Sequence, residues 1–403
     1  MDALRRLVWG LFVFFCAGCL SKPVVLAPGG DSGRDLAEDA DSASQRGADD
    51  GVGNGADAAD SALDASGLST EGTAEADGRG GELEATDLPP SCPAGVTGCG
   101  GECCPSLAGY GVYCNTRGHC EYKNLDNAGW RNWDVWIWLP PGTMKMGSPQ
   151  DEVGREPDEE DSTTEDKLHP VSFEQGFFIG KYEIVVQHYE ACVEAGPCGP
   201  AGPRTVPDGP WDINTSANGR SNHPQDGLTW QQATQFCSWA APGGKLPSEA
   251  QWEYAAKGPV HRKYPWGDGP EPTCDNNTAV FDGFDPVGVP PWACDPCWEL
   301  GCSGTKQVGS KSEGISWSGA LDMAGNVGEW CDDWYNQDLA LLPLDGTSCQ
   351  QAGPLGLVKT IRGGCCVWGD IHLRSANRTA LAYTESNFAF GARCVRPPPP
   401  PGQ

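Results

Sequence analysis

The stretch that decides the fold of this chain is 320-ALDMAGNVGEW-330, which is followed after about thirty residues by the turn Arg362-Gly363-Gly364. An earlier segment, 245-KLPSEAQWEY-254, contains a helix-start signal. Ser248 can cap the first turn, and Gln251 stands three residues later. The sequence therefore predicts a helix over 248–256, surrounded by Gly-, Pro- and Asn-rich loops.

The rest of the large C-terminal region has few regular patterns. Aromatic and β-branched residues predict strands at Trp133–Leu139 and Phe177–Glu183. Apolar spacing predicts helices at Val185–Glu194 and Thr229–Ala240. The acidic stretch Asp151–Asp166 has no periodicity, which indicates a surface loop. These patterns predict an α+β fold with little regular secondary structure.

Nine pieces of this region, from about 136 to 396, occur in the order typical of one family. They resemble the formylglycine-generating enzyme family, also called sulfatase-modifying factors. The pieces are VWIWLPPGTMKMGS, the GRxxDE-like acidic piece near Arg155, FFIGKYEI, NHPQDGLTW, KLPSEAQWEYAAKG, YPWGDG, LDMAGNVGEW, RGG and GARC. The resemblance implies that residues 130–397 form a disulfide-rich α+β domain related to the C-type-lectin-like fold.

The resemblance implies a first calcium site built on the stretch that decides the fold. The Asp322 side chain, backbone carbonyls near Gly325 and Val327, and the Glu329 carboxylate would hold the ion. Carboxylate and carbonyl oxygens suit calcium, and a Gly-rich turn lets successive carbonyls converge. In the alternative reading, Asp322 caps a turn and Glu329 pairs with an arginine.

Two further features are implied by the resemblance alone. A second calcium site would use Asn277, the carbonyl of Thr278 and an acid near Glu299. A family disulfide would join Cys237 to Cys394, whereas the cysteines of a second family bridge are replaced together by Ala256 and Ser375.

The activity implied by the resemblance is that of an oxidoreductase. Copper held by two thiolates activates oxygen, which converts a cysteine of an exported sulfatase-like substrate into formylglycine. In active members one cysteine lies four residues after the second glycine of RGG. Here that position is Trp368, and its partner position falls near His372. A tryptophan of the family motif is also Gly328 here.

The remaining candidates for catalysis are Cys365 and Cys366, directly after the RGG turn. Two adjacent sulfurs could share a metal ion, but we favour the alternative, in which each pairs with a different loop cysteine such as Cys331 or Cys349. Because three active-site positions are altered, the sequence disfavours formylglycine synthesis. Two functions therefore stay open, the family's oxidoreductase activity and a non-catalytic surface module that binds peptide or glycan on the lectin-like scaffold.

Cysteine usage indicates an oxidising compartment. The chain has 20 cysteines, and setting aside Cys16 and Cys19 leaves 18, an even number. Six of them fall within residues 91–122. This segment is too short to be stabilised by a hydrophobic core alone, so we predict a small module held by three disulfides. Six cysteines allow fifteen connectivities. A metal cluster is the rival reading of this module. We expect no free thiol in the folded protein. Cys192 and Cys198 should form a short local bridge. Cys274, Cys294, Cys297 and Cys302 should form two further bridges, although their spacing also suits zinc.

The N-terminus predicts export and lipidation. Residues 1–19 have two arginines, a short apolar run and small residues before Cys19, as in a bacterial lipoprotein signal; a plain secretory signal is the alternative. Residues 20–90 are acidic and contain no aromatic residue, which predicts a disordered tether, and 398–403 form a Pro-rich tail. We therefore expect a protein of the bacterial cell envelope, lipid-anchored at the outer membrane or cell surface.

The charge of the chain restricts its partners. The formal net charge is −28, so there is no excess of basic side chains to release counterions from nucleic acid. The expected partners are the membrane, through the N-terminal lipid, and an exported protein or glycan.

Overall fold

A computed structural model describes residue 92 and the ranges 97–126, 133–202, 213–273, 275–281 and 304–399. The predicted signal peptide, the tether, Cys274, the loop cysteines 294–302 and most of the Pro-rich tail lie outside the described residues. No helix within the described ranges is both long and apolar enough to cross a bilayer.

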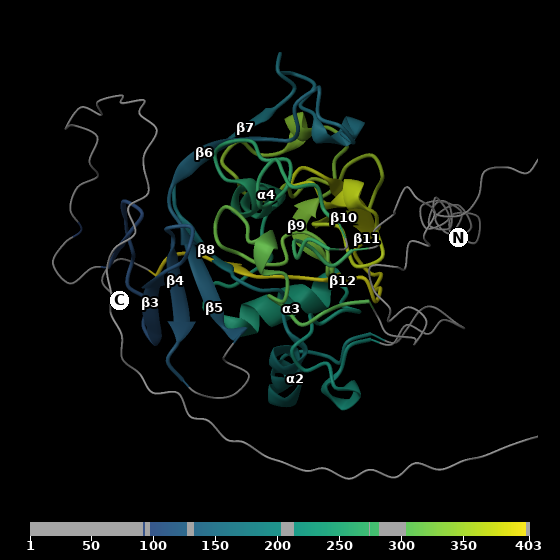
Figure 1. Ribbon diagram of the computed structural model, residues 1–403. Coiled ribbons are helices and arrows are strands. Elements are labelled where there is room, and N and C mark those ends of the chain that lie inside the picture. Colours follow the sequence, from purple (N-terminus) through teal and green to yellow (C-terminus); the bar gives the residue numbers. More distant parts are fainter. Residues whose placement is uncertain are drawn as a thin grey trace, which may run out of the picture. The chain divides into compact units, whose positions relative to one another are not determined.

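The larger sheet contains the first strand that the sequence predicts. Its order is β13-β8-β5-β4-β3, and all neighbours are antiparallel (Figure 1). Strand β5 has every residue buried, which fits its continuous apolar sequence. The strands are β3 (Tyr110–Cys114), β4 (Cys120–Asn124), β5 (Val135–Leu139), β8 (Phe177–Gly180) and β13 (Val395–Arg396).

A second sheet carries the RGG turn, in the order β11-β10-β9-β12. Strand β12 runs parallel to β9, whereas the other pairs are antiparallel. The strands are β9 (Gly328–Trp334), β10 (Val358–Arg362), β11 (Arg378–Ala382) and β12 (Phe390–Gly391). Two short ribbons complete the strands, β1 (Gly98–Cys99) with β2 (Glu102–Cys103) and β6 (Gly142–Met146) with β7 (His169–Phe173).

Three α-helices form where the sequence predicts them, each starting one residue later. They are α2 (Val186–Ala195), α3 (Trp230–Ala240) and α4 (Glu249–Lys257). The first predicted residue of α3 and of α4 is the N-cap, because Thr229 and Ser248 have extended backbones and accept hydrogen bonds from Gln232 N and Gln251 N. The 3₁₀ turns are Pro157–Glu159, Ser216–Asn218, Ser312–Gly314, Leu339–Leu341 and Asp370–Leu373. An α+β fold with little helix is confirmed.

The six-cysteine segment continues the sheet of the large domain. Its second hairpin strand, β4, pairs with β5 in a regular antiparallel register. Asn115 donates to Ser318 O, and Arg117 donates to Ile315 O, so the turn between β3 and β4 contacts a distant loop. The segment forms three disulfides, Cys92–Cys103, Cys99–Cys114 and Cys104–Cys120.

Two more disulfides lie among the described residues, the local Cys192–Cys198 bridge and Cys237–Cys394. The second ties α3 to the segment before β13 across 157 residues of sequence. The prediction that no thiol is free is wrong, because Cys331 and Cys349 are buried thiols. Counting cysteines cannot show this, because an even total does not say which sulfurs the fold brings within bonding distance.

Candidate functional site

The RGG turn lies at the end of β10 and is fixed by Arg362. This side chain is buried and donates to Ala376 O and Asn377 O at 2.8 Å, and also to the Glu253 carboxylate. Gly364 has a φ of +68°, and a Cβ there would lie 2.7 Å from His372 O. The turn therefore needs glycine both for its left-handed backbone and for close approach to the following loop.

Cys365 and Cys366, the candidate catalytic pair, follow this turn into the protein interior. Their exposed fractions are 0% and 7%, and Cys366 N donates to Asn326 O at 3.0 Å. A Cβ on Gly304 would lie 3.3 Å from the Cys366 sulfur. The Cys366 backbone therefore lies beside the 320–330 stretch, and both cysteine side chains are buried.

At the position where the resemblance would place the first catalytic cysteine, aromatic rings pack together. The Trp368 ring meets Phe390 edge-on at 5.7 Å and lies 5.0 Å from His372. The His372 Nδ1 lies 3.3 Å from Asn377 Oδ1, and burial lowers the pKa of this imidazole. These contacts fill the position with apolar rings and a neutral imidazole.

The 320–330 stretch folds into a turn with an unusual backbone. Asp322, Gly325 and Asn326 have φ values of +57°, +80° and +61°. A Cβ on Gly325 would lie 2.1 Å from Val280 O. Asp and Asn tolerate the left-handed region better than most residues, and here glycine alone fits beside Val280. The residue types of the motif are thus required by its backbone.

The two carboxylates predicted to bind calcium both lie in this turn region and are buried. Glu329 accepts from Arg393 Nη2 at 2.6 Å and Nε at 2.7 Å, and from Trp252 Nε1 at 2.7 Å. Asp322 Oδ2 accepts from Gly309 N, and burial raises the pKa of this carboxyl to about 6. Both contacts of the alternative reading, a capped turn and a Glu–Arg pair, are therefore present.

Glu183 is a third buried carboxylate here, and the sequence reading missed it. Its oxygens accept from Asn326 Nδ2 at 2.7 Å and Val327 N at 3.1 Å. Burial raises its pKa well above the ordinary value, and repulsion from Asp322 and Glu329 adds to this effect. Of the three buried carboxylates, Glu329 is the one that pairs with the guanidinium of Arg393. The Asp322 and Glu329 carboxylates, with backbone carbonyls of the same turn, are oxygen ligands of the kind that a hard divalent cation takes.

The described residues of the second predicted calcium site contact the 312–314 turn. Asn277 O accepts from Glu313 N at 3.1 Å, and Asn277 Nδ2 donates to Ser312 Oγ at 3.2 Å. The carbonyl oxygen of Thr278 packs closely on Gly314. A Cβ on Gly314 would lie 1.8 Å from this oxygen. The predicted acidic partner near 299 is outside the described residues.

Helix α4 brings further charges to the centre of the domain, which periodicity alone would not predict. Glu249 pairs with Arg378 at 2.6 Å, and Glu253 pairs with Lys257 at 2.6 Å. All four side chains are buried. Glu249, Glu253 and Lys257 follow an i, i+4 spacing in the sequence, but only the tertiary fold shows that this charged face of α4 points inward.

Residues 123–398, more than half of the chain, match the family described as "Sulfatase-modifying factor enzyme 1-like domain". The formylglycine-generating enzyme of Thermomonospora curvata is 27% identical over 298 residues, which cover 64% of this chain and 92% of that protein. The enzyme of the same name from Streptomyces coelicolor is 32% identical over 192 residues, covering 46% and 56% of the two chains.

Part of the chain is also similar to proteins with other names. The serine/threonine-protein kinase pkn1 of Chlamydia caviae is 32% identical over 181 residues, which cover 44% of this chain and 25% of the kinase. Among solved structures, PvdO from Pseudomonas aeruginosa is 24% identical, with a TM-score of 0.49, and covers 65% of this chain and 94% of its own. The family match spans the sheet, the RGG turn and the carboxylate cluster, and this chain belongs to the sulfatase-modifying factor family.

Proposed function

We propose that this chain is an exported, lipid-anchored family member that acts as a binding module and not as a formylglycine-generating oxidoreductase. One observation carries the proposal. The position of the first catalytic cysteine is Trp368, packed against Phe390, and the nearby Cys365 and Cys366 are buried. A copper site that oxidises a cysteine of a protein substrate needs thiolates that the substrate can approach. These residues do not fit that requirement.

The test is a copper(I) titration of the folded protein, combined with an assay for thiol loss from a sulfatase-derived cysteine peptide. We expect neither stoichiometric copper binding nor peptide oxidation. Tight one-to-one binding that disappears in both Cys365→Ser and Cys366→Ser would restore the oxidoreductase. Cys349→Ser is the matched control, because Cys349 is a buried thiol away from the RGG turn.

A shallow, open groove along the exposed face of α3 supports this function. It has a volume of about 420 Å³ and is lined by uncharged side chains: Pro197, Trp230, Gln231, Thr234, Gln235, Ser238 and Trp239. The Trp230 indole is fixed because its Nε1 donates to Cys331 O at 3.0 Å. Indole faces with amide and hydroxyl neighbours suit uncharged ligands such as glycans or polar peptides.

Binding of a glycan or peptide panel would test the groove. Gln235→Arg places a long charged side chain in it and should abolish binding, whereas Gln350→Arg, at another exposed position, should not. Unchanged binding by Gln235→Arg would place the binding surface elsewhere on the domain.

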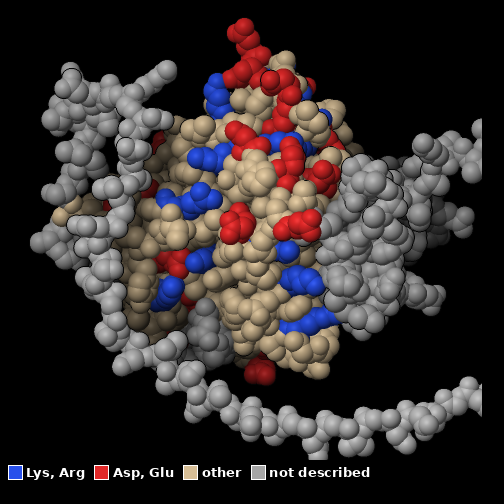
Figure 2. Space-filling view, viewed as in Figure 1, with Lys and Arg blue, Asp and Glu red and all other residues tan. Residues whose placement is uncertain are grey.

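The charge of the domain supports a partner other than nucleic acid. On the face in Figure 2, lysines and arginines are scattered among acidic side chains. Phosphate backbones favour a concentrated basic surface, and the whole chain carries a formal charge of −28.

Calcium binding at the 320–330 turn is part of the proposal. Asp322 and Glu329 would supply carboxylates, and Gly325 and Val327 would supply carbonyls. The excess of buried carboxylates over contacting cations supports this role. When bound, the ion would supply positive charge that holds the loops around the RGG turn, so its role would be structural.

Export and anchoring rest on the N-terminal sequence. Acylation of Cys19 would place the mature protein in the bacterial cell envelope, with its domain beyond an acidic segment. Intact-mass analysis of the membrane fraction should give a chain that starts at Cys19 with added acyl groups. In Cys19→Ala the protein should leave the membrane fraction, and retention there without acylation would contradict the anchor.

A further inference from the structure

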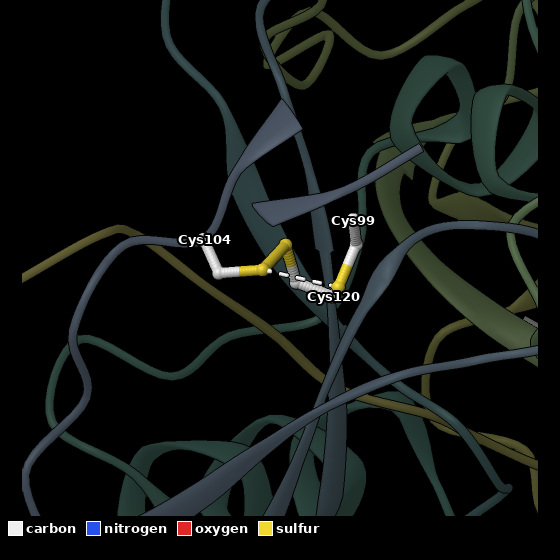
Figure 3. A group of neighbouring side chains, drawn as sticks. All are labelled: Cys99, Cys104 and Cys120. Carbon is white, nitrogen blue, oxygen red and sulfur yellow. Dashed lines mark hydrogen bonds between the residues drawn. A yellow bond between two sulfur atoms is a disulfide. The ribbon is translucent and has the colours of Figure 1, made fainter. Parts of the chain in front are cut away.

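Three buried sulfurs meet at the centre of the six-cysteine segment. Cys99 Sγ lies 3.4 Å from Cys104 Sγ, and Cys104 is bonded to Cys120. Figure 3 shows the Cys99 side chain directed at this bridge. The sulfurs of Cys99, Cys104 and Cys120 all lie within 4.8 Å of one another, and each is in a disulfide. A metal needs thiolates, so this contact between two bridges favours exchange chemistry instead.

The other end of the Cys99 bridge reaches the surface. Its partner Cys114 is exposed on β3, whereas Cys99 is 2% exposed. A dissolved thiolate can therefore attack Cys114 Sγ, and the leaving group is the Cys99 thiolate. When the Cys99 thiolate is released, its sulfur is already in contact with the Cys104–Cys120 bridge.

The register of the β3–β4 hairpin places Cys120 where it can bond to Cys114 in the last step of an exchange. Cys114 and Cys120 are directly opposite each other in the antiparallel pair β3–β4. Directly opposite residues have Cα atoms about 4.5 or 5.5 Å apart, which lies within the range for a disulfide. Cys120 thus has Cys114 as a second possible partner.

The geometry points to a thiol-triggered disulfide relay in this segment, with Cys114 as the entry site for a small thiol. In the first step the thiolate bonds to Cys114 and releases the Cys99 thiolate. Cys99 then attacks Cys104, which forms Cys99–Cys104 and releases the Cys120 thiolate. Finally Cys120 attacks the mixed disulfide at Cys114, forming Cys114–Cys120 and returning the small thiolate. The four cysteines of the relay form two disulfides before and after, so no net oxidant or reductant is consumed.

The exchange changes what the bridges hold together. In the structure, one bridge ties β1 to β3 and the other ties the end of β2 to β4. After exchange each bridge is local, one within the β1–β2 arm and one within the β3–β4 hairpin. The arm 92–104 then loses both disulfide links to β3 and β4, although Cys92–Cys103 still closes it. The relay would thus release the arm that follows the N-terminal segment.

Disulfide mapping of the full chain tests the relay. The folded protein is incubated without oxygen in glutathione, quenched in acid, alkylated and cleaved after Glu102, Tyr113 and Arg117. Together with cuts after Glu84 and Lys123, these cuts leave four cysteine-containing fragments, 85–102, 103–113, 114–117 and 118–123. The observed pairing links all four in one species. The exchanged pairing gives two species, 85–102 with 103–113 and 114–117 with 118–123.

We expect the four-fragment species to convert into these two species with no gain in alkylated thiols. A chain that keeps Cys104–Cys120 and becomes alkylated at Cys99 would overturn the relay, as would a four-fragment species that resists glutathione. Cys114→Ser is the second measurement, since it leaves Cys99 as a thiol beside the intact bridge; part of the label should appear on Cys120. In the control Cys92→Ser, the label should remain on Cys103, which lies outside the three-sulfur group.

Discussion

Arg393 binds Glu329 through both carboxylate oxygens, with Nη2 2.6 Å from Oε1 and Nε 2.7 Å from Oε2. Both side chains are fully buried. The same guanidinium donates to Leu321 O at 2.9 Å, so one residue near the C-terminus holds both ends of the 320–330 turn. The pair therefore connects the GARC and NVGEW motifs of the family.

Removing this guanidinium should strongly destabilise the domain. In Arg393→Met, Glu329 keeps the Trp252 indole as a partner but loses its buried counter-charge. Breaking a buried ion pair costs about 3–5 kcal/mol of unfolding free energy, which urea denaturation would measure. Lys145→Met, which breaks the exposed pair with Asp166, should leave the midpoint unchanged. An unchanged midpoint in Arg393→Met would contradict the role given to this pair.

Calcium should raise the thermal stability of the domain through Asp322. A ligand that binds the native state alone stabilises it by mass action, so a chelator should lower the Tm of the natural protein. Asp322→Asn should remove this calcium dependence. Asp332→Asn, in the same region but outside the carboxylate cluster, should keep it. Equal Tm values with and without chelator in the natural chain would exclude the ion.

His223 should make stability fall on acidification. Burial, with smaller contributions from Arg220 and Lys306, lowers the pKa of its imidazole to about 4 from 6.5. Because the folded state disfavours the charged form, the contribution of His223 is complete above about pH 6.5 and is lost as the pH falls towards 4. The stability advantage of the natural chain over His223→Gln should shrink over this range. If the difference in unfolding free energy between the two proteins stayed constant from pH 7 to 4.5, the role given to His223 would be wrong.

Cys331 and Cys349 should be unreactive thiols in the native protein. Burial raises the pKa of both, and nearby carboxylates add to the effect, so thiolate is scarce at neutral pH. Iodoacetamide should label neither residue in buffer and both in concentrated urea, as read by peptide mass spectrometry. Label at either residue under native conditions, or none after unfolding, would contradict the assignment.

Local patterns in the sequence were enough to predict the helices and strands whose formation depends on neighbouring residues. The helix starts at Thr229 and Ser248 follow from a cap and its partner three residues later, and both capping boxes form. The apolar run of β5 and the glycines of the RGG turn are likewise set by burial and backbone sterics, which act over a few residues. The family motifs added the Cys237–Cys394 pair, which spacing alone could not give.

The tertiary structure decided the contacts between residues far apart in the chain. Glu183 accepts a hydrogen bond from Asn326, 143 residues later in the chain, and no local pattern marks this contact. Cys331 and Cys349 remain thiols although the cysteine count permits full pairing. The sequence by itself determined the family, the helix caps and the composition of the turns, because these depend on local geometry. Which charges and sulfurs meet was decided by the fold, because partner choice depends on distances that the assembled sheets alone define.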